Sequence, residues 1–232
     1  MLKRLMFVAL VSLPQTPLQA QHAMIVQKLE EWNRAAPAPH HSRLQAEIAR
    51  VAPAIYRSGE GCRTSPVTLD TVRPATADRF VFTGVLRGTL RNGWIVTARL
   101  PGCDSAPVRF MTMQATDGAL TTIRVNRGQS HAWDSLIGDT LPLAALGAQA
   151  AMKRQGIACE LQAPATLGIT RIADEDGLGP DVFGARYQGG WSEVWPIETC
   201  GHVAEVTVAF TADGDGGAYT RVPGDAVRIL AR

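Results

Sequence analysis

The stretches GWIVTARLPGC (residues 93–103) and GWSEVWPIETC (residues 190–200) each place a glycine, a tryptophan and a cysteine at the same three positions. They lie 97 residues apart, and the offset continues upstream, where Cys62 and Cys159 each precede the closing cysteine by 41 residues. Self-similarity at a fixed distance is typical of a duplicated unit. The sequence therefore predicts two tandem units, residues 41–138 and 139–232.

The cysteines predict disulfides. Their number is even, and no CxxC pair of the zinc-binding or redox type is present. Four cysteines allow three connectivities. The repeat favours one bridge within each unit, Cys62–Cys103 and Cys159–Cys200, because a duplicated unit that folds alone must close its own bridge.

Each unit reads as one helix followed by an antiparallel β-meander, which is an α+β fold. The first helix begins at Ser42 and ends before Gly59; the second begins at Asp139 or Thr140 and ends before Gly156. Short β-type runs follow each first cysteine. They cover residues 66–72, 79–86, 94–100, 108–114 and 120–125 in the first unit, and 165–172, 182–187, 191–197, 203–211 and 219–222 in the second.

The repeat also predicts which side chains face the helices. Met111 and Met113 fall on Val208 and Phe210 at the same offset of 97. Because side chains alternate along a strand, all four are expected to point toward the helix of their unit. Residues 127–140 are expected to form a linker between the units.

The N-terminus predicts export. Lys3 and Arg4 precede an apolar run, residues 5–13, and a cleavage site follows Ala20, so residues 1–20 read as a signal peptide. The apolar run is too short to span a bilayer, and no transmembrane segment is expected in the mature chain. Residues 21–40 are expected to form an N-terminal helix, 24–35, and a linker. The predicted location is periplasmic or extracellular.

The charge balance gives no indication of a nucleic-acid partner. Without the predicted signal peptide the chain has 21 basic and 21 acidic side chains. Nucleic-acid binding requires a basic surface that neutralises phosphates, and a neutral chain does not predict one.

No catalytic or metal-binding constellation emerges from the sequence. Residues 130–135, SHAWDS, hold serine, histidine and aspartate together, but a triad is normally assembled from distant segments. The segment instead predicts a linker in which Trp133, Leu136 and Ile137 pack between the units. His202 has glutamates on neighbouring predicted strands. The Asp-rich stretches, 174–181 and 213–217, lack the full calcium loop and read as turns. No cofactor is expected.

The candidate binding residues are Glu193 and Trp195. They share one face of a predicted strand, and the first unit has Val96 and Ala98 at the same positions. If this face is open, the pair forms an aromatic and acidic recognition surface. If the helix covers it, Trp195 belongs to the core and Glu193 is an unusual buried acid.

These features favour a non-enzymatic binding or interaction protein of the bacterial cell envelope. Its partner is expected to be an envelope protein or a small ligand. One alternative is an exported hydrolase that uses His131 or His202. Another is a secreted inhibitor, because tandem helix-and-meander units with one bridge each resemble the architecture of the secreted β-lactamase inhibitor protein family.

Overall fold

The computed structural model describes residues 17–55, 66–100 and 106–230. Their helices are α1 (Pro17–Ala35), α2 (His41–Ile55), α3 (Arg79–Leu86) and α4 (Asp134–Arg154). Their strands are β1 (Thr68–Pro74), β2 (Leu90–Arg99), β3 (Val108–Ala115), β4 (Leu120–Gly128), β5 (Ala165–Leu167), β6 (Ile169–Asp176), β7 (Gly190–Thr199), β8 (His202–Ala212), β9 (Ala218–Arg221) and β10 (Val227–Ile229). The chain is thus a mixed α+β protein, as the sequence predicts.

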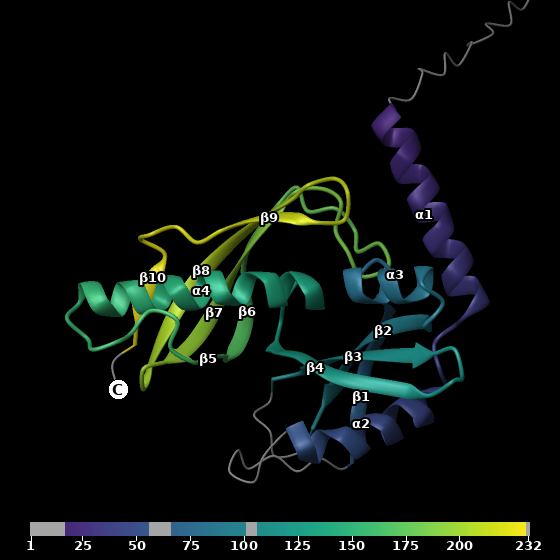
Figure 1. Cartoon of the computed structure of the whole chain (residues 1–232), viewed down its shortest axis with the longest axis horizontal. Helices are drawn as coiled ribbons and strands as arrows, with labels where there is room; N and C mark the ends of the chain where they lie inside the picture. Colours follow the sequence, from purple (N-terminus) through teal and green to yellow (C-terminus); the bar gives the residue numbers. More distant parts are fainter. Residues whose placement is uncertain (1–16, 56–65, 101–105, 231–232) are drawn as a thin grey trace, which may run out of the picture.

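The strands form one mixed sheet in the order β1-β2-β3-β4-β6-β7-β8-β10, with β5 beside β7 and β9 beside β8. Every pairing is antiparallel except β4 with β6, which are parallel over two residue pairs. This short junction separates a first lobe (α2, α3 and β1–β4) from a second lobe (α4 and β5–β10), as Figure 1 shows.

Helices cover both faces of the first-lobe sheet. On one face, Leu44 and Ile48 of α2 pack with Trp94 and Phe110. On the other face, Val81 of α3 forms a smaller cluster with three buried residues, Ala75, Ile95 and Met111. The amphipathic stripe predicted for α2 therefore lies against the sheet.

The segment 79–86 was predicted to be a strand, and this prediction is wrong, because it forms helix α3. Its β-branched and aromatic residues favour a strand locally. The helix prevails because Asp78 caps its N-terminus, accepting the Phe80 N–H at 2.9 Å. Val81 also packs tightly over Gly93, where any Cβ would lie 2.5 Å from the valine side chain.

In the second lobe, α4 lies across one face of the sheet (Figure 1). Its buried face is built from small residues, including Ala144 and Ala148, which allow close approach to Trp191, Trp195 and Phe210. The Cys159–Cys200 disulfide joins the segment after α4 to the end of β7. The sequence predicted this bridge; Cys62 and Cys103 lie outside the described residues.

The facing predicted for Met111 is wrong. Trp94 pairs with Thr112 on β3, whereas Trp191 pairs with Phe210 on β8. The two lobes therefore differ by one residue in register at the same sequence offset. A shift of one residue moves a strand's side chains to the opposite face. Met111 accordingly packs on the α3 side, while Phe110 faces α2.

Helix α4 begins at Asp134, five residues before the earliest predicted start. The cause is non-local: Asp78 of the first lobe accepts the Ser135 N–H at 2.9 Å through its second carboxylate oxygen. One buried carboxylate thereby caps α3 and α4 together. The linker between lobes is consequently short, residues 129–133.

A loop of the second lobe, residues 177–189, reaches back to the first lobe. Residues 182–187 were predicted as a strand, but they form only an isolated bridge between Val182 and Ala185. Asp181 pairs with Arg73 at 2.6 Å, and the Phe183 carbonyl accepts the Ala77 N–H at 2.9 Å. The segment serves as a contact between lobes instead of a further strand.

The predicted N-terminal helix, 24–35, lies within α1, which extends away from the body of the protein at its N-terminal end (Figure 1). Residues 1–16, the larger part of the predicted signal peptide, lie outside the described residues, and cleavage after Ala20 stays a prediction. Within the described residues, no helix is both long and apolar enough to cross a membrane.

Candidate ligand-binding site

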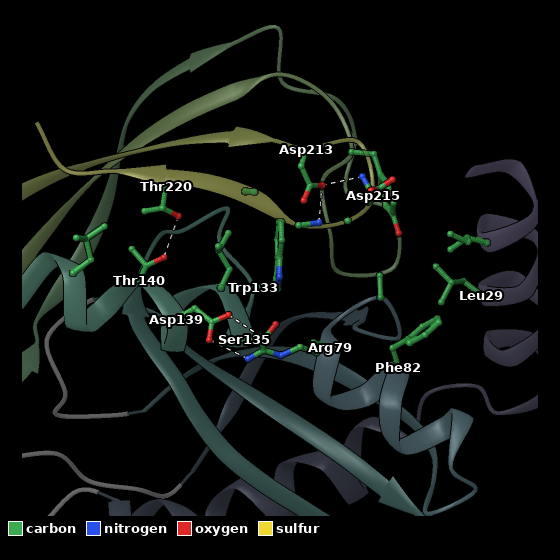
Figure 2. A pocket seen from close by; sticks show the side chains of 18 residues that line it. Leu29, Arg79, Phe82, Trp133, Ser135, Asp139, Thr140, Asp213, Asp215 and Thr220 are labelled. Atoms are coloured by element: carbon green, nitrogen blue, oxygen red, sulfur yellow. Dashed lines mark hydrogen bonds and ion pairs between the residues drawn. The ribbon is translucent and has the colours of Figure 1, made fainter. Parts of the chain in front are cut away.

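A pocket of about 570 Å³ lies where α1, α3 and the start of α4 meet the turn 213–217, which joins β8 to β9 (Figure 2). It sits at the junction of the two lobes and draws residues from segments as distant as Ile25 and Thr220. Pockets that bind small molecules usually measure about 300–1,000 Å³ and are mostly apolar with a few placed polar groups. This pocket has that size and composition.

The walls are mainly apolar. Leu29 comes from α1, Phe82 from α3, Trp133 from the position before α4, and Tyr187 from the loop 177–189. Trp32 packs its ring 5.5 Å from that of Phe82, which holds α1 against α3. This contact fixes α1 relative to α3, so protein packing alone positions two walls of the pocket.

Two buried residues present unpaired polar atoms to the pocket. Ser135 and Trp133 are each only 4% exposed. The Ser135 hydroxyl and the Trp133 indole N–H have no hydrogen-bond partner among the described residues, and neither atom is fully enclosed by protein. Both atoms keep access to the pocket, where they can bond to water or to a bound molecule. The pair is therefore available to a ligand.

The turn 213–217 forms an acidic rim. The Asp213 carboxylate accepts the N–H groups of Asp215 and Gly217 at 2.8 and 2.9 Å through Oδ1. Gly214 and Gly216 have φ of +90° and +93°, a conformation that glycine adopts without strain. The turn thereby holds two carboxylates at the mouth of the pocket, as Figure 2 shows.

Four other polar side chains of the pocket are paired with one another. Arg79 and Asp139 form a two-pronged ion pair at 2.9 and 3.0 Å. The hydroxyls of Thr140 and Thr220 lie 3.3 Å apart, so they link α4 to β9 across the pocket wall. Asp213 and Asp215, in contrast, have no cation within ion-pair distance among the described residues.

The pKa of Tyr187 is affected by the acidic turn 213–217. Burial, followed by the negative charge of Asp213, raises the pKa of its phenol above the ordinary value. The negative charge of Asp213 therefore influences a side chain in the pocket wall.

Beside the pocket, a second carboxylate accompanies Asp78 at the joined N-termini of α3 and α4. Burial, followed by the charge of Asp78, raises the pKa of Asp134 to about 6. An unfolded aspartate titrates near 3.9. Because the folded pKa is the higher one, ionisation of Asp134 opposes folding, and this loss of stability develops as the pH rises from about 4 to about 6.

We therefore expect Asp134→Asn to stabilise the protein at pH 8 and not at pH 4. Allowing for solvent screening of a carboxylate that is only partly buried, the gain at pH 8 should be on the order of 1 kcal/mol, or about 2–4 °C in Tm. Thermal unfolding at the two pH values measures it, with the exposed Asp225→Asn as control. An equal change at both pH values would contradict the assignment.

The predicted binding residues, Glu193 and Trp195, are 0% exposed. The Glu193 Oε1 accepts four hydrogen bonds, from the Ser130 hydroxyl, the N–H groups of His131 and Ala132, and the Trp191 indole, at 2.8–3.1 Å. Its Oε2 accepts the Trp195 indole N–H at 2.8 Å. Helix α4 therefore covers the strand face that carries Glu193 and Trp195, which is the second of the two alternatives considered from the sequence. Ligand binding by Glu193 and Trp195 stays a prediction.

Glu193 holds the linker from the second lobe, and Arg109 holds it from the first. The Arg109 guanidinium donates to the carbonyls of Ser130 and Ala132 at 3.1 and 3.0 Å. Burial lowers the pKa of Arg109 to about 10, which leaves it charged at neutral pH. Glu193 thus binds N–H groups of the linker, and Arg109 binds its carbonyl groups.

The candidate catalytic histidines make structural contacts. The His131 Nε2 lies 2.6 Å from Glu175, and Arg186 lies 3.1 Å from its Nδ1. The Ser130 hydroxyl bonds to Glu193, and no contact joins it to His131. His202 contacts the Cys200 carbonyl at 3.0 Å. The described residues therefore contain no serine–histidine pair at these positions.

The Asp-rich stretches adopt different structures. The turn predicted for residues 174–181 is wrong at its start, because Asp174 and Asp176 lie in strand β6, whereas Asp213 and Asp215 form the turn described above, as predicted. Across the described ranges, no group of three or more histidine, cysteine or acidic side chains is arranged to hold a metal ion.

Comparisons of the chain with family models, curated proteins and solved structures find no match. The site is therefore defined by its geometry alone. Sequence reasoning singled out the turn 213–217 and the packing of Trp133 separately, but it did not predict that they share a pocket. The available signal was the position of Trp133 in the predicted linker, and the sequence pattern does not place the turn 213–217 near it.

Proposed function

We propose that this is an exported, non-enzymatic binding protein that takes a small ligand in the pocket at the lobe junction. The observation that carries the proposal is a mainly apolar pocket in which the Ser135 hydroxyl and the Trp133 indole N–H have no protein hydrogen-bond partner among the described residues. A ligand with an apolar body and a hydrogen-bonding group satisfies both features.

Export to the periplasm or beyond the cell is part of the same proposal. The Cys159–Cys200 disulfide supports it, because disulfides persist in oxidising compartments. The sequence pattern of residues 1–20 supports it independently. The hydrolase alternative gains no support from the contacts of His131 and His202.

We also propose that the two lobes derive from one duplicated unit. The 97-residue offset places β2 on β7 and β3 on most of β8. The register difference and the helix α3 then reflect divergence. On this view the pocket arose at the contact between two copies, which explains why elements of both lobes line it.

Binding can be tested with N-phenyl-1-naphthylamine, a neutral aromatic dye that becomes fluorescent in apolar surroundings. The mature protein should bind it, and Ala218→Trp, which fills the pocket from β9, should weaken binding about tenfold or more, because the ring occupies the ligand's volume. Fluorescence titration of both proteins measures the effect.

Ala163→Trp is the matched control, because Ala163 lines a separate groove along α4. It should leave dye binding unchanged. Dye binding that is absent from the wild-type protein, or that Ala218→Trp leaves intact, would overturn the assignment of the pocket.

A further inference from the structure

We infer that the pocket selects a small organic cation, with its positive group at the 213–217 turn, an aromatic or aliphatic body, and a hydrogen-bonding group at the inner end. This inference rests on the proposed function and specifies the chemistry of its ligand. Three independent features of the pocket support it.

The first feature is uncompensated charge at the mouth. Of the acidic groups that line the pocket, Asp139 has its own cation, Arg79, while Asp213 and Asp215 have none among the described residues. The pocket is therefore negative at one end only. Carboxylates beside an apolar wall attract cations more strongly than carboxylates in open water, because the dielectric constant is lower there.

The second feature is the orientation of Asp213. Its Oδ1 is occupied by two backbone N–H groups, which leaves Oδ2 without a hydrogen bond among the described residues. Oδ2 lies so close to Gly217 that a Cβ there would be 2.3 Å away. The turn thus fixes the carboxylate and keeps one oxygen available to an incoming N–H donor.

The third feature is the inner end of the pocket. Figure 2 shows Asp213 and Asp215 at one end, Ser135 near the opposite end, and Trp133 between them. An indole N–H only donates, so it requires an acceptor from the ligand, and the Ser135 hydroxyl accepts or donates. The rings of Trp133 and Phe82 suit an apolar or aromatic body, and aromatic faces attract cations.

Four probes of nearly equal shape test the charge and the inner group separately: tyramine, phenethylamine, 4-ethylphenol and 3-(4-hydroxyphenyl)propionate. Each is titrated as a competitor of N-phenyl-1-naphthylamine on the mature protein. Tyramine should bind about tenfold more tightly than neutral 4-ethylphenol. Phenethylamine, which lacks the phenol, should fall between them, and the anionic propionate should bind weakest.

Asp213→Asn combined with Asp215→Asn should abolish the preference for tyramine over 4-ethylphenol, with both affinities calculated from the dye affinity measured for the same variant. Asp225→Asn, an exposed change outside the pocket, is the control and should keep the preference. The preference should also weaken as salt is raised, because the carboxylates are exposed.

The outcomes separate the two proposals. If the dye binds, three results would overturn the cation inference and leave the pocket assignment standing. They are equal affinity for tyramine and 4-ethylphenol, no competition by any of the probes, and a preference for tyramine that survives the double substitution. Failure of the dye to bind the wild-type protein overturns both.

Discussion

Glu193→Ala is expected to lower the free energy of unfolding by about 3–5 kcal/mol, which corresponds to a fall in Tm of roughly 6–20 °C for a chain of this size. The substitution removes the acceptor of five hydrogen bonds, three of them from the linker between the lobes. Each buried donor left without a partner costs about 1–3 kcal/mol before the surroundings relax. Chemical denaturation and calorimetry measure the loss.

The matched control is Glu198→Ala, because Glu198 lies on the same strand with its side chain exposed. It should change stability by no more than about 0.5 kcal/mol. Glu193→Gln should give an intermediate loss, since the amide retains one acceptor oxygen but turns N–H groups toward a donor. Glu193→Ala with wild-type stability would show that the linker does not depend on this carboxylate.

This network changes the meaning of the differences between the two halves. The first lobe has Val96 where the second has Glu193, and the second has Val206 where the first has Arg109. The difference at Glu193 contributed to its prediction as a binding residue. In the structure, both charged residues hold the linker, a segment without regular secondary structure whose backbone groups need partners. At these two positions, the differences between the halves serve the joining of the lobes.

The sequence pattern predicted those helices and strands that are determined by their own residues. The alternation in residues 191–197 and the stripe of Leu44 and Ile48 correspond to β7 and α2. The start of α4 was missed because its cap, Asp78, comes from the other lobe. The register of β3 was missed because a one-residue shift leaves no mark on either strand's own sequence.

The candidate site was harder to predict for the same reason. Its walls come from α1, α3, α4 and the turn 213–217, so no window of sequence contains it. The sequence indicated a turn at Asp213 and interlobe packing by Trp133, but convergence is a property of the tertiary structure. Conversely, Glu193 and Trp195 stand out in sequence because of their chemistry, and that chemistry is used within the core.

Trp195→Ala is expected to destabilise the protein by about 3–5 kcal/mol, as is Trp191→Ala, because both side chains are buried between α4 and the sheet. The rings of Trp191 and Trp195 lie 4.9 and 5.9 Å from that of Phe210, so either truncation leaves a cavity beside the same neighbour. Trp195→Ala also leaves one oxygen of Glu193 without its donor. Thermal unfolding of the two variants side by side measures both losses.

Trp195→Phe separates the contribution of volume from that of the hydrogen bond. It keeps most of the ring and removes the indole N–H, so it should lose about 1–3 kcal/mol, less than the alanine variant. If Trp195→Ala melted with the wild-type protein while Trp191→Ala did not, the core assignment of Trp195 would be wrong. Parallel losses would mean that a ligand reaches Trp195 only by opening the core, which directs the search for binding to the pocket lined by Trp133 and Ser135.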